Sequence, residues 1–244
     1  MHQIGGREEE RRRSPGRVDF GQRLFDGWQL HHATRHRMTI SNYETQALFA
    51  EAIFRADIGH AISDEQIAYI KGLKMIRNQV NLISENLYLF EEPEMKSISD
   101  AIQEVLDLYA SEVMGITQQL YVTQSWSLVN DTDVGMHGHS HSNSIISGSL
   151  YFCDLPSPVA RMVFDRHKSY QQIEFVPEAD KKNIYNAPFN VITPKKNEVL
   201  LFPSGLQHFV EPNQSPLPRH SIAFNTFVRG KLGNFRDVSE LTLK

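Results

Sequence analysis

The second half of the chain consists of short strand-like segments, and this pattern limits the folds that the chain can adopt. From about Ile116 onward, β-branched and aromatic residues recur in short runs, separated by turns rich in Pro, Asn, Asp and Gly. Eight segments have this character, at residues 119–129, 143–152, 161–165, 172–176, 189–193, 198–203, 207–211 and 220–228. Because no helical pattern separates them, they predict a sandwich or barrel, and eight strands suit a double-sheet jelly roll.

Two helices are predicted before these strands. Residues 64–77 follow Ser63, a candidate N-cap, and they carry acidic residues in the first turn and apolar residues at helical spacing. Residues 92–115 have Pro93 in the first turn and Gly115 at the end, around a second apolar stripe. The expected fold is therefore mainly β with N-terminal helices, an α+β protein with a jelly-roll, cupin-like core.

The N-terminal 37 residues differ in composition from the rest of the chain. They hold eight arginines and no lysine, whereas all ten lysines lie after Met38. The charge run at residues 7–13 is typical of a solvated, disordered segment. An arm that binds nucleic acid is the alternative, but three glutamates lie among the arginines and weaken it. We predict residues 1–37 to be a disordered extension outside the fold, with Met38 as an ordinary start.

Residues 38–244 are predicted to form a single domain. The 244-residue chain is 40% hydrophobic, which is enough to bury one substantial core. The first part of the domain, residues 38–115, contains both helices and a partly alternating segment at residues 47–58. That alternation predicts a strand, with a short helix as the alternative. The jelly-roll core is expected at residues 116–230.

Composition argues against several classes of protein. The net charge of -4 gives no case for binding to nucleic acid or membranes. Cys153 is the only cysteine, which excludes an internal disulfide and a cysteine-rich zinc module and fits a reducing compartment. No apolar run is long enough to cross a bilayer, and the N-terminus lacks the apolar core of a signal peptide. We therefore expect a soluble cytoplasmic protein.

Three histidines at alternate positions, His137, His139 and His141, indicate a metal site. Residues i and i+2 of an extended chain point to the same side, so two such imidazoles can reach one ion. His208 follows the turn at residues 204–205 on a distant predicted strand, and distant strands pair across a jelly roll. We predict His139, His141 and His208 as a three-ligand site with open positions, and His137 as a neighbour. A flexible polar loop or an adventitious metal-binding tract is the alternative.

A candidate carboxylate receptor follows eleven residues after His208. Arg219 and Ser221 share the same alternate spacing on a predicted strand. The planar fork of an arginine suits a carboxylate, and a serine hydroxyl supplies another hydrogen bond. A surface ion pair is the alternative, but the strand is otherwise apolar and no acidic residue lies nearby in sequence. An open metal site beside such a receptor suggests a small acid with a chelating end and a distal carboxylate, which is the shape of 2-oxoglutarate.

Three stretches, "HSHSNSIISGSLYF", "EVLLFPSGLQHFVEP" and "RHSIAFN", resemble the 2-oxoglutarate/Fe(II) oxygenases of marine bacteria and phages. That family belongs to the double-stranded β-helix superfamily, near its prolyl-hydroxylase-like branch. The upstream "SWSLVN" is similar to its Trp-x-x-x-Asn region. Ser142 and Asn197 stand where the family usually has Pro and Gly, and Leu150 stands where it often has Tyr.

The resemblance implies iron ligation by His139, His141 and His208, and a receptor for the distal carboxylate of 2-oxoglutarate at Arg219 and Ser221. It implies Fe(II), 2-oxoglutarate and O2 as cofactor and co-substrates, with ascorbate as a supporting reductant. Other pocket residues are implied at the positions of Trp126, Asn130, Tyr151 and His137, although Trp126 is alternatively a core residue. The implied activity is hydroxylation of an unidentified substrate, with release of succinate and CO2.

One departure from the wider superfamily concerns His141. Most members use two histidines and one carboxylate, and His141 takes the place of the carboxylate. This leaves open whether the metal is iron. The alternatives to the oxygenase are a cupin-like three-histidine dioxygenase or isomerase without 2-oxoglutarate, and a non-catalytic jelly-roll module. The expected substrate is a small molecule or a protein side chain, without membrane or nucleic acid, and a homodimer is an open hypothesis.

Overall fold

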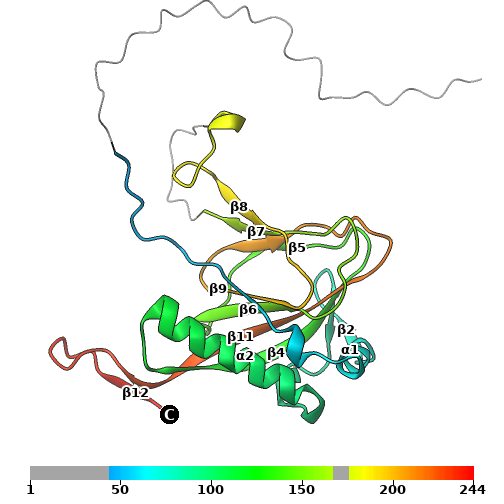
Figure 1. Cartoon of the computed structure of the whole chain (residues 1–244), viewed down its shortest axis with the longest axis horizontal. Coiled ribbons are helices and arrows are strands. Elements are labelled where there is room, and N and C mark those ends of the chain that lie inside the picture. Colours follow the sequence, from blue (N-terminus) through cyan, green and yellow to red (C-terminus); the bar gives the residue numbers. More distant parts are fainter. Residues whose placement is uncertain (1–43, 167–175) are drawn as a thin grey trace, which may run out of the picture. The chain divides into compact units, whose positions relative to one another are not determined.

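Two antiparallel sheets lie face to face in the computed structural model, which describes residues 44–166 and 176–244 (Figure 1). The larger sheet has the order β1-β9-β6-β11-β4-β3-β2, and β12 pairs with the end of β11. The smaller sheet has the order β5-β10-β7-β8. The strands of the larger sheet are β1 (Phe54–Asp57), β2 (Met75–Arg77), β3 (Leu82–Ser84), β4 (Gln119–Asn130), β6 (Ile146–Tyr151), β9 (Glu198–Pro203), β11 (Arg219–Leu232) and β12 (Leu241–Leu243). Those of the smaller sheet are β5 (Met136–His139), β7 (Met162–Asp165), β8 (Phe189–Ile192) and β10 (His208–Val210).

The central strands of the larger sheet are buried on both faces. Along β6 and β9, every second side chain joins the core beneath the helices, as Leu150 and Leu201 do. The intervening side chains, such as Tyr151 and Phe202, pack toward the smaller sheet. Gly148 lies opposite Phe224, and a Cβ added to it would lie 2.1 Å from the phenyl ring, so the close contact requires glycine. This two-sided burial explains why these strands appear in the sequence as nearly continuous apolar runs.

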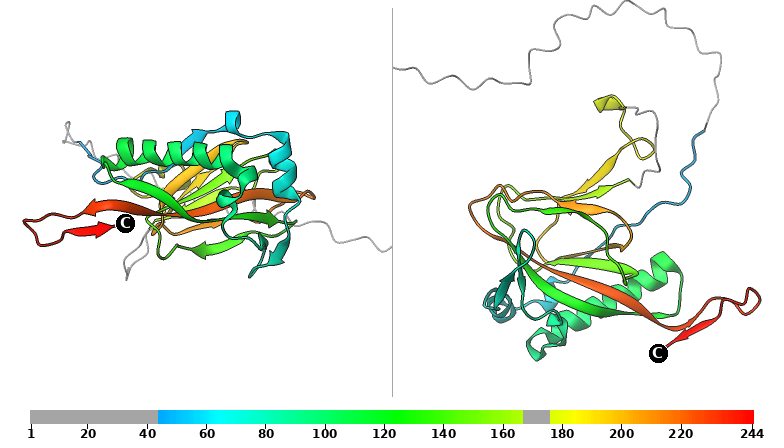
Figure 2. Two further views of the ribbon diagram at one scale, coloured as in Figure 1. Left: turned by 90° about the horizontal axis from the view of Figure 1, so that it is seen from below. Right: turned by 180° about the vertical axis from the view of Figure 1, so that it is seen from behind.

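Helix α2 (Lys96–Tyr109) covers the outer face of the larger sheet (Figures 1 and 2). It buries the stripe at Ile98, Ile102 and Leu106, and it continues into a π-helical turn at Ala110–Met114. The shorter α1 (Asp64–Lys71) begins with a capping box between Ser63 and Gln66. Four 3-10 turns complete the helical elements of the described residues, η1 (Gly59–Ala61), η2 (Leu89–Glu91), η3 (Pro93–Met95) and η5 (Ala179–Lys181). The mainly β, double-stranded β-helix fold with two helices is therefore confirmed.

Two predicted elements were too long. The helix expected at residues 64–77 ends at Lys71, because the next residue, Gly72, is unfavourable inside a helix. Residues Met75–Arg77 form strand β2 and pair with β3 instead. Of the strand expected at residues 47–58, only Phe54–Asp57 is a strand, since only these residues pair with β9. Phe49, upstream of it, has a φ of 58°, which interrupts an extended conformation.

Seven of the eight predicted strands of the second half match β4, β6, β7, β8, β9, β10 and β11. The eighth, at residues 172–176, lies almost wholly outside the described residues, as do the predicted extension at 1–37 and His167, which the sequence suggests is a surface residue. Asn197 adopts a φ of 65°, a turn conformation that favours glycine and that asparagine tolerates.

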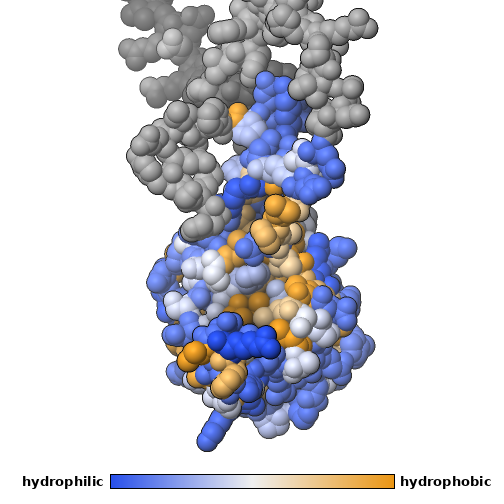
Figure 3. Space-filling model, turned by 90° about the vertical axis from the view of Figure 1, so that its left-hand side faces the viewer, coloured by the Kyte–Doolittle hydropathy of each residue, from blue (hydrophilic) through white to orange (hydrophobic). Residues whose placement is uncertain are grey.

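The β11–β12 hairpin extends beyond the sheet at one side of the domain (Figures 1 and 2). Its connection exposes two large apolar side chains, Phe235 and Val238. Figure 3 views the molecule from this side and shows apolar surface among polar residues. No helix within the described ranges is long and apolar enough to cross a membrane.

Candidate active site

Three histidine side chains converge between the two sheets. His139 ends β5 and lies opposite His208, the first residue of β10, in the register of the smaller sheet. His141 follows β5 in the connection to the larger sheet, and its backbone N–H donates to the carbonyl of Ser204 at 2.9 Å. The ring nitrogens available as ligands in the three residues all lie within 4.8 Å of one another. The three histidines predicted from the sequence therefore lie together, although His141 lies in a loop and not on a strand.

Backbone carbonyls fix the orientation of two of these rings. Nδ1 of His139 lies 2.8 Å from the carbonyl of His137, and Nδ1 of His208 lies 2.9 Å from the carbonyl of Leu206. Because a carbonyl only accepts, each Nδ1 carries the proton and each Nε2 is left with its lone pair. Nε2 of His208 lies 3.4 Å from Nε2 of His141. This arrangement of donated Nδ1–H and free Nε2 is the one that metal-binding histidines adopt.

The environment keeps two of the imidazoles neutral. Burial, with a smaller contribution from the neighbouring histidines, lowers the pKa of His141 from its ordinary 6.5 to about 4. Burial likewise lowers the pKa of His208 to about 4, against the opposing effect of its hydrogen bond to Leu206. A metal ion requires the neutral form of the ligand. Both side chains are therefore available to a metal across the physiological pH range.

A cavity of about 280 Å³ opens beside the histidines, and Arg219 and Ser221 lie in its wall. Arg219 is 3% exposed, and within the described ranges no carboxylate forms an ion pair with it and its Nε has no hydrogen-bond partner. Its guanidinium lies over the ring of Tyr151, 5.1 Å from the centroid. A buried cation without an anionic partner is costly, so the cavity is suited to an acidic ligand.

The Tyr151 hydroxyl is the second unpartnered group in this wall. The side chain is fully buried, and its hydroxyl has no hydrogen-bond partner among the described residues. Burial raises the pKa of Tyr151, so the hydroxyl keeps its proton and can donate. Together Arg219 and Tyr151 present donors into a cavity that contains no aspartate or glutamate in its lining.

The remaining residues expected at the pocket also line the cavity. These are Trp126, Asn130 and His137. The amide of Asn130 donates to the carbonyls of Val134 at 3.3 Å and Gly135 at 3.1 Å, so it anchors the β4–β5 connection. Trp126 is partly buried and faces the cavity, whereas His137 is exposed at its mouth.

Comparison with known proteins agrees with this geometry. Residues 124–225 match the protein family described as "Putative 2OG-Fe(II) oxygenase", and this stretch includes all three histidines, Arg219 and Ser221. The segment is a 2-oxoglutarate/Fe(II) oxygenase core. None of the curated proteins is similar enough to match the chain.

Solved structures share the fold of this oxygenase at low sequence identity. A 2OG-Fe(II) oxygenase family protein from Burkholderia pseudomallei is 11% identical, with a TM-score of 0.50, over 71% of this chain and 83% of that chain. HygX from Streptomyces hygroscopicus, solved with nickel, 2-oxoglutarate and hygromycin B, is 12% identical, with a TM-score of 0.51, over 72% and 82%. The carbocyclase SnoK from nogalamycin biosynthesis is 14% identical, with a TM-score of 0.51, over 74% and 81%.

The oxygenase site rests on a buried hydroxyl cluster that sequence reasoning missed. Ser147 of β6 and Ser204, after β9, are 2.9 Å apart through their hydroxyls, and Ser204 also donates to Ser144 at 2.7 Å. Ser147 donates in turn to Asn225 of β11 at 3.0 Å. The backbone carbonyl of Ser204 accepts the N–H of His141, so the cluster holds in place the residue whose main chain positions one ligand. The repeated serines of "SNSIISGS" are the only sequence signal for it.

Sequence reasoning also missed the amides of the β2–β3 hairpin. Asn78, Gln79 and Asn81 line the histidine cavity from the hairpin tip, and Asn81 is buried. The hairpin consists of two three-residue strands, which are too short to show a period in the sequence.

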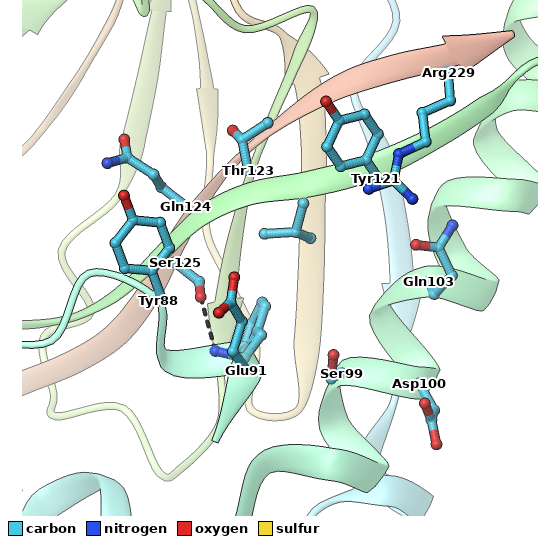
Figure 4. A pocket seen from close by; sticks show the side chains of 12 residues that line it. Tyr88, Glu91, Ser99, Asp100, Gln103, Tyr121, Thr123, Gln124, Ser125 and Arg229 are labelled. Atoms are coloured by element: carbon cyan, nitrogen blue, oxygen red, sulfur yellow. Dashed lines mark hydrogen bonds between the residues drawn. The ribbon is translucent and has the colours of Figure 1, made fainter. Parts of the chain in front are cut away.

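A second cavity of about 290 Å³ lies apart from the histidines (Figure 4). It lies between α2, η2 and the first half of β4, and Tyr88, Gln103 and Tyr121 are among its lining residues. Arg229 stacks on Tyr121, 4.0 Å from the ring centroid. It shares no lining residue with the histidine cavity, so the chemistry of the oxygenase belongs to the first cavity.

Proposed function

We propose that His139, His141 and His208 hold the iron of this 2-oxoglutarate-dependent oxygenase, and that Arg219 and Ser221 bind the distal carboxylate of 2-oxoglutarate. The observation that carries the proposal is the buried Arg219, which lacks an acidic partner in the described chain and lies in the same cavity as the histidines. With the cofactors bound, O2 converts 2-oxoglutarate to succinate and CO2, one oxygen atom entering succinate and the other turning a substrate C–H into C–OH.

The protein residues contribute binding, orientation and exclusion of water. The fork of Arg219 fits a carboxylate in two parallel hydrogen bonds, and Ser221 and Tyr151 offer further donors beside it. The three imidazoles would hold the ion and leave its remaining positions open to 2-oxoglutarate and O2. Apolar side chains at Leu128, Met162 and Phe202 line the same cavity, so the reacting groups meet in a largely dry space.

The test measures succinate formation from 2-oxoglutarate by the full chain with Fe(II) and ascorbate, together with iron binding. The Arg219→Gln variant should raise the KM for 2-oxoglutarate at least about a hundredfold, because a desolvated charge partner is lost, and should retain iron. Arg229→Gln is the matched control, since Arg229 lies on the same strand, exposed and outside the histidine cavity. Unchanged 2-oxoglutarate kinetics in Arg219→Gln would contradict the assignment.

The metal is tested separately, because three neutral ligands leave the ion with a higher charge than the usual two histidines and one carboxylate. We propose Fe(II). Metal analysis of the isolated protein and titration with Fe(II), Zn(II) and Ni(II) would check it. His139→Ala should abolish binding of the active metal, whereas His60→Ala, at an exposed histidine of η1, should not. Bound iron with no 2-oxoglutarate turnover would favour a three-histidine enzyme of another kind.

We also propose that the substrate is a small molecule and not a protein side chain. We propose further that the protein is cytoplasmic, where the buried thiol of Cys153 stays reduced. HygX, with hygromycin B bound, is a fold neighbour with a small-molecule ligand, and this supports the first choice. The similarity to marine bacterial and phage oxygenases and to the prolyl-hydroxylase-like branch stays a prediction, as does the separation of residues 1–37 from the domain. The exposed Phe235 and Val238 support the homodimer hypothesis, which light scattering would test.

A further inference from the structure

An open cleft adjoins the histidine cavity at its mouth. It has a volume of about 510 Å³ and shares four lining residues with the cavity, Gln79, Met136, His137 and Val210. Its walls come from the β2–β3 hairpin, the β4–β5 connection and the end of β10. The hairpin and the connection lie at the same end of the sandwich in both views (Figures 1 and 2). A substrate seated in the cleft would therefore reach the histidines past His137.

The cleft carries one positive and one negative side chain. Arg77 ends β2 on one wall, and Asp133 lies in the β4–β5 connection on another. Both are exposed, and among residues 44–166 and 176–244 neither takes part in an ion pair. Asp133 is held in place by Gln214, which donates to its Oδ1 at 3.3 Å, and by its own N–H, which donates to the carbonyl of Asn213 at 2.7 Å. The two charges are thus available to a ligand.

Apolar groups make up most of the remaining lining. They are Val80, Val134, Met136, Phe209, Val210 and Pro212. Gln79 and His137 are the further hydrogen-bonding side chains between this lining and the histidine cavity. A complementary ligand carries a carboxylate for Arg77, an ammonium group for Asp133 and an apolar body.

We propose that this cleft binds the prime substrate and that the substrate is a zwitterion of the amino-acid class with an apolar side chain. This inference rests on the proposed function. The charged ends lie in the open cleft, and the apolar body extends past His137 and Met136 toward the histidines. An amino acid is compact enough for this, since the histidine cavity must also hold 2-oxoglutarate.

The experiment uses the full chain with Fe(II), 2-oxoglutarate and ascorbate, and follows succinate formation and product mass. Probes are leucine, methionine, phenylalanine and proline, each compared with its N-acetyl and carboxamide derivatives. We expect at least one free amino acid to raise succinate formation several-fold above the substrate-free rate and to gain one oxygen atom. Its N-acetyl and amide derivatives should have kcat/KM values at least about tenfold lower, because each lacks one of the two charges.

Two variants test whether Arg77 binds the carboxylate of the substrate and Asp133 its ammonium group. Arg77→Gln should lower kcat/KM for the free amino acid about tenfold and remove the preference over the amide. Asp133→Asn should remove the preference over the N-acetyl derivative, and asparagine tolerates the φ of 63° at this position. Lys74→Gln is the control, because Lys74 flanks the same hairpin but pairs with Glu85 outside the cleft. Substrate-free 2-oxoglutarate turnover should be unchanged in Lys74→Gln.

The two proposals fail in different ways. Persistent substrate-free turnover with no stimulation by any amino acid, or equal stimulation by the charge-blocked derivatives, would overturn the zwitterion inference and leave the oxygenase assignment intact. If Arg77→Gln and Asp133→Asn still preferred the free amino acid over its derivatives as strongly as the wild type, the assignment of this cleft as the binding site of the substrate would be overturned. Loss of both iron binding and 2-oxoglutarate turnover in the unmodified chain would overturn the proposed function, and the inference with it.

Discussion

The metal-free oxygenase should lose stability when the pH falls from 7 to 5, because the folded chain holds His141 and His208 neutral. Their pKa values are about 4 in the fold, against about 6.5 in the unfolded chain. A lowered histidine pKa means that the unfolded state binds more protons throughout this window. Stability is therefore fully present above about pH 6.5 and is lost progressively as the pH falls toward 4.

The size of the loss follows from these pKa values. For one histidine, the linkage relation gives roughly 2 kcal/mol between pH 7 and pH 5, so the pair gives about 4 kcal/mol. That is a large part of the 5–15 kcal/mol by which domains are typically stable. The sum is an upper value, because each imidazolium disfavours the other and the two do not titrate independently.

The assay is urea unfolding of the chelator-treated protein at several pH values. His141→Gln and His208→Gln should each reduce the pH dependence by roughly 2 kcal/mol, because glutamine does not titrate in this range. His60→Gln, which removes an exposed histidine, is the control and should leave the pH dependence of the unfolding free energy unchanged. If the unfolding free energy of both site variants depended on pH as strongly as that of the wild type, burial of these two imidazoles would not be the cause of the acid sensitivity.

Three further outcomes are expected. Tyr151→Phe should stabilise the ligand-free protein by about 1 kcal/mol, as measured by urea unfolding, because the buried hydroxyl has no partner in the described chain. The same variant should weaken 2-oxoglutarate binding, as measured by calorimetric titration, because it removes a donor from the cavity. Ser204→Ala should weaken metal affinity about tenfold, because it removes the hydroxyl that bonds Ser144 and Ser147 and so loosens the turn whose carbonyl accepts the His141 N–H. Ser111→Ala, at an exposed serine, should not change the affinity. Gly148→Ala should cost about 1–3 kcal/mol, since its Cβ would overlap the Phe224 ring, whereas Gly205→Ala, with open space around the Cβ, should be neutral in the same thermal unfolding assay.

The long, two-sided strands were predictable because burial on both faces leaves a continuous apolar run, as in β6 and β9. Strands β2, β3 and β12 were not predicted, because each has three residues and three residues carry no measurable period. Gly72 was the available signal that the first helix ends early, and apolar spacing beyond it outweighed that signal.

The candidate site was predictable in residue identity and less so in geometry. His139, His208 and Arg219 lie on strands, so their alternation or register could be inferred from sequence. His141 is placed by one backbone hydrogen bond to Ser204, which depends on a turn sixty-three residues later. The carbonyls that orient His139 and His208 belong to residues two positions before each, and only folded geometry shows that they are near enough to accept.

The charge of the assembled site connects His141 with the substrate. With three neutral imidazoles, a divalent metal, the dianion of 2-oxoglutarate and the cation of Arg219 sum to a net charge of about +1. A carboxylate in the place of His141 would bring the same sum to about zero. None of the residues that line the histidine cavity is acidic, so the protein does not balance this positive charge there.

A substrate that brings its own carboxylate to the mouth of this cavity would supply the missing negative charge, and the exposed Arg77 would hold that carboxylate away from the metal. His141→Asp should therefore restore neutrality at the metal and weaken the preference for the carboxylate-bearing substrate over its amide, which the succinate assay would detect. An unchanged preference would show that the cleft alone selects the charge.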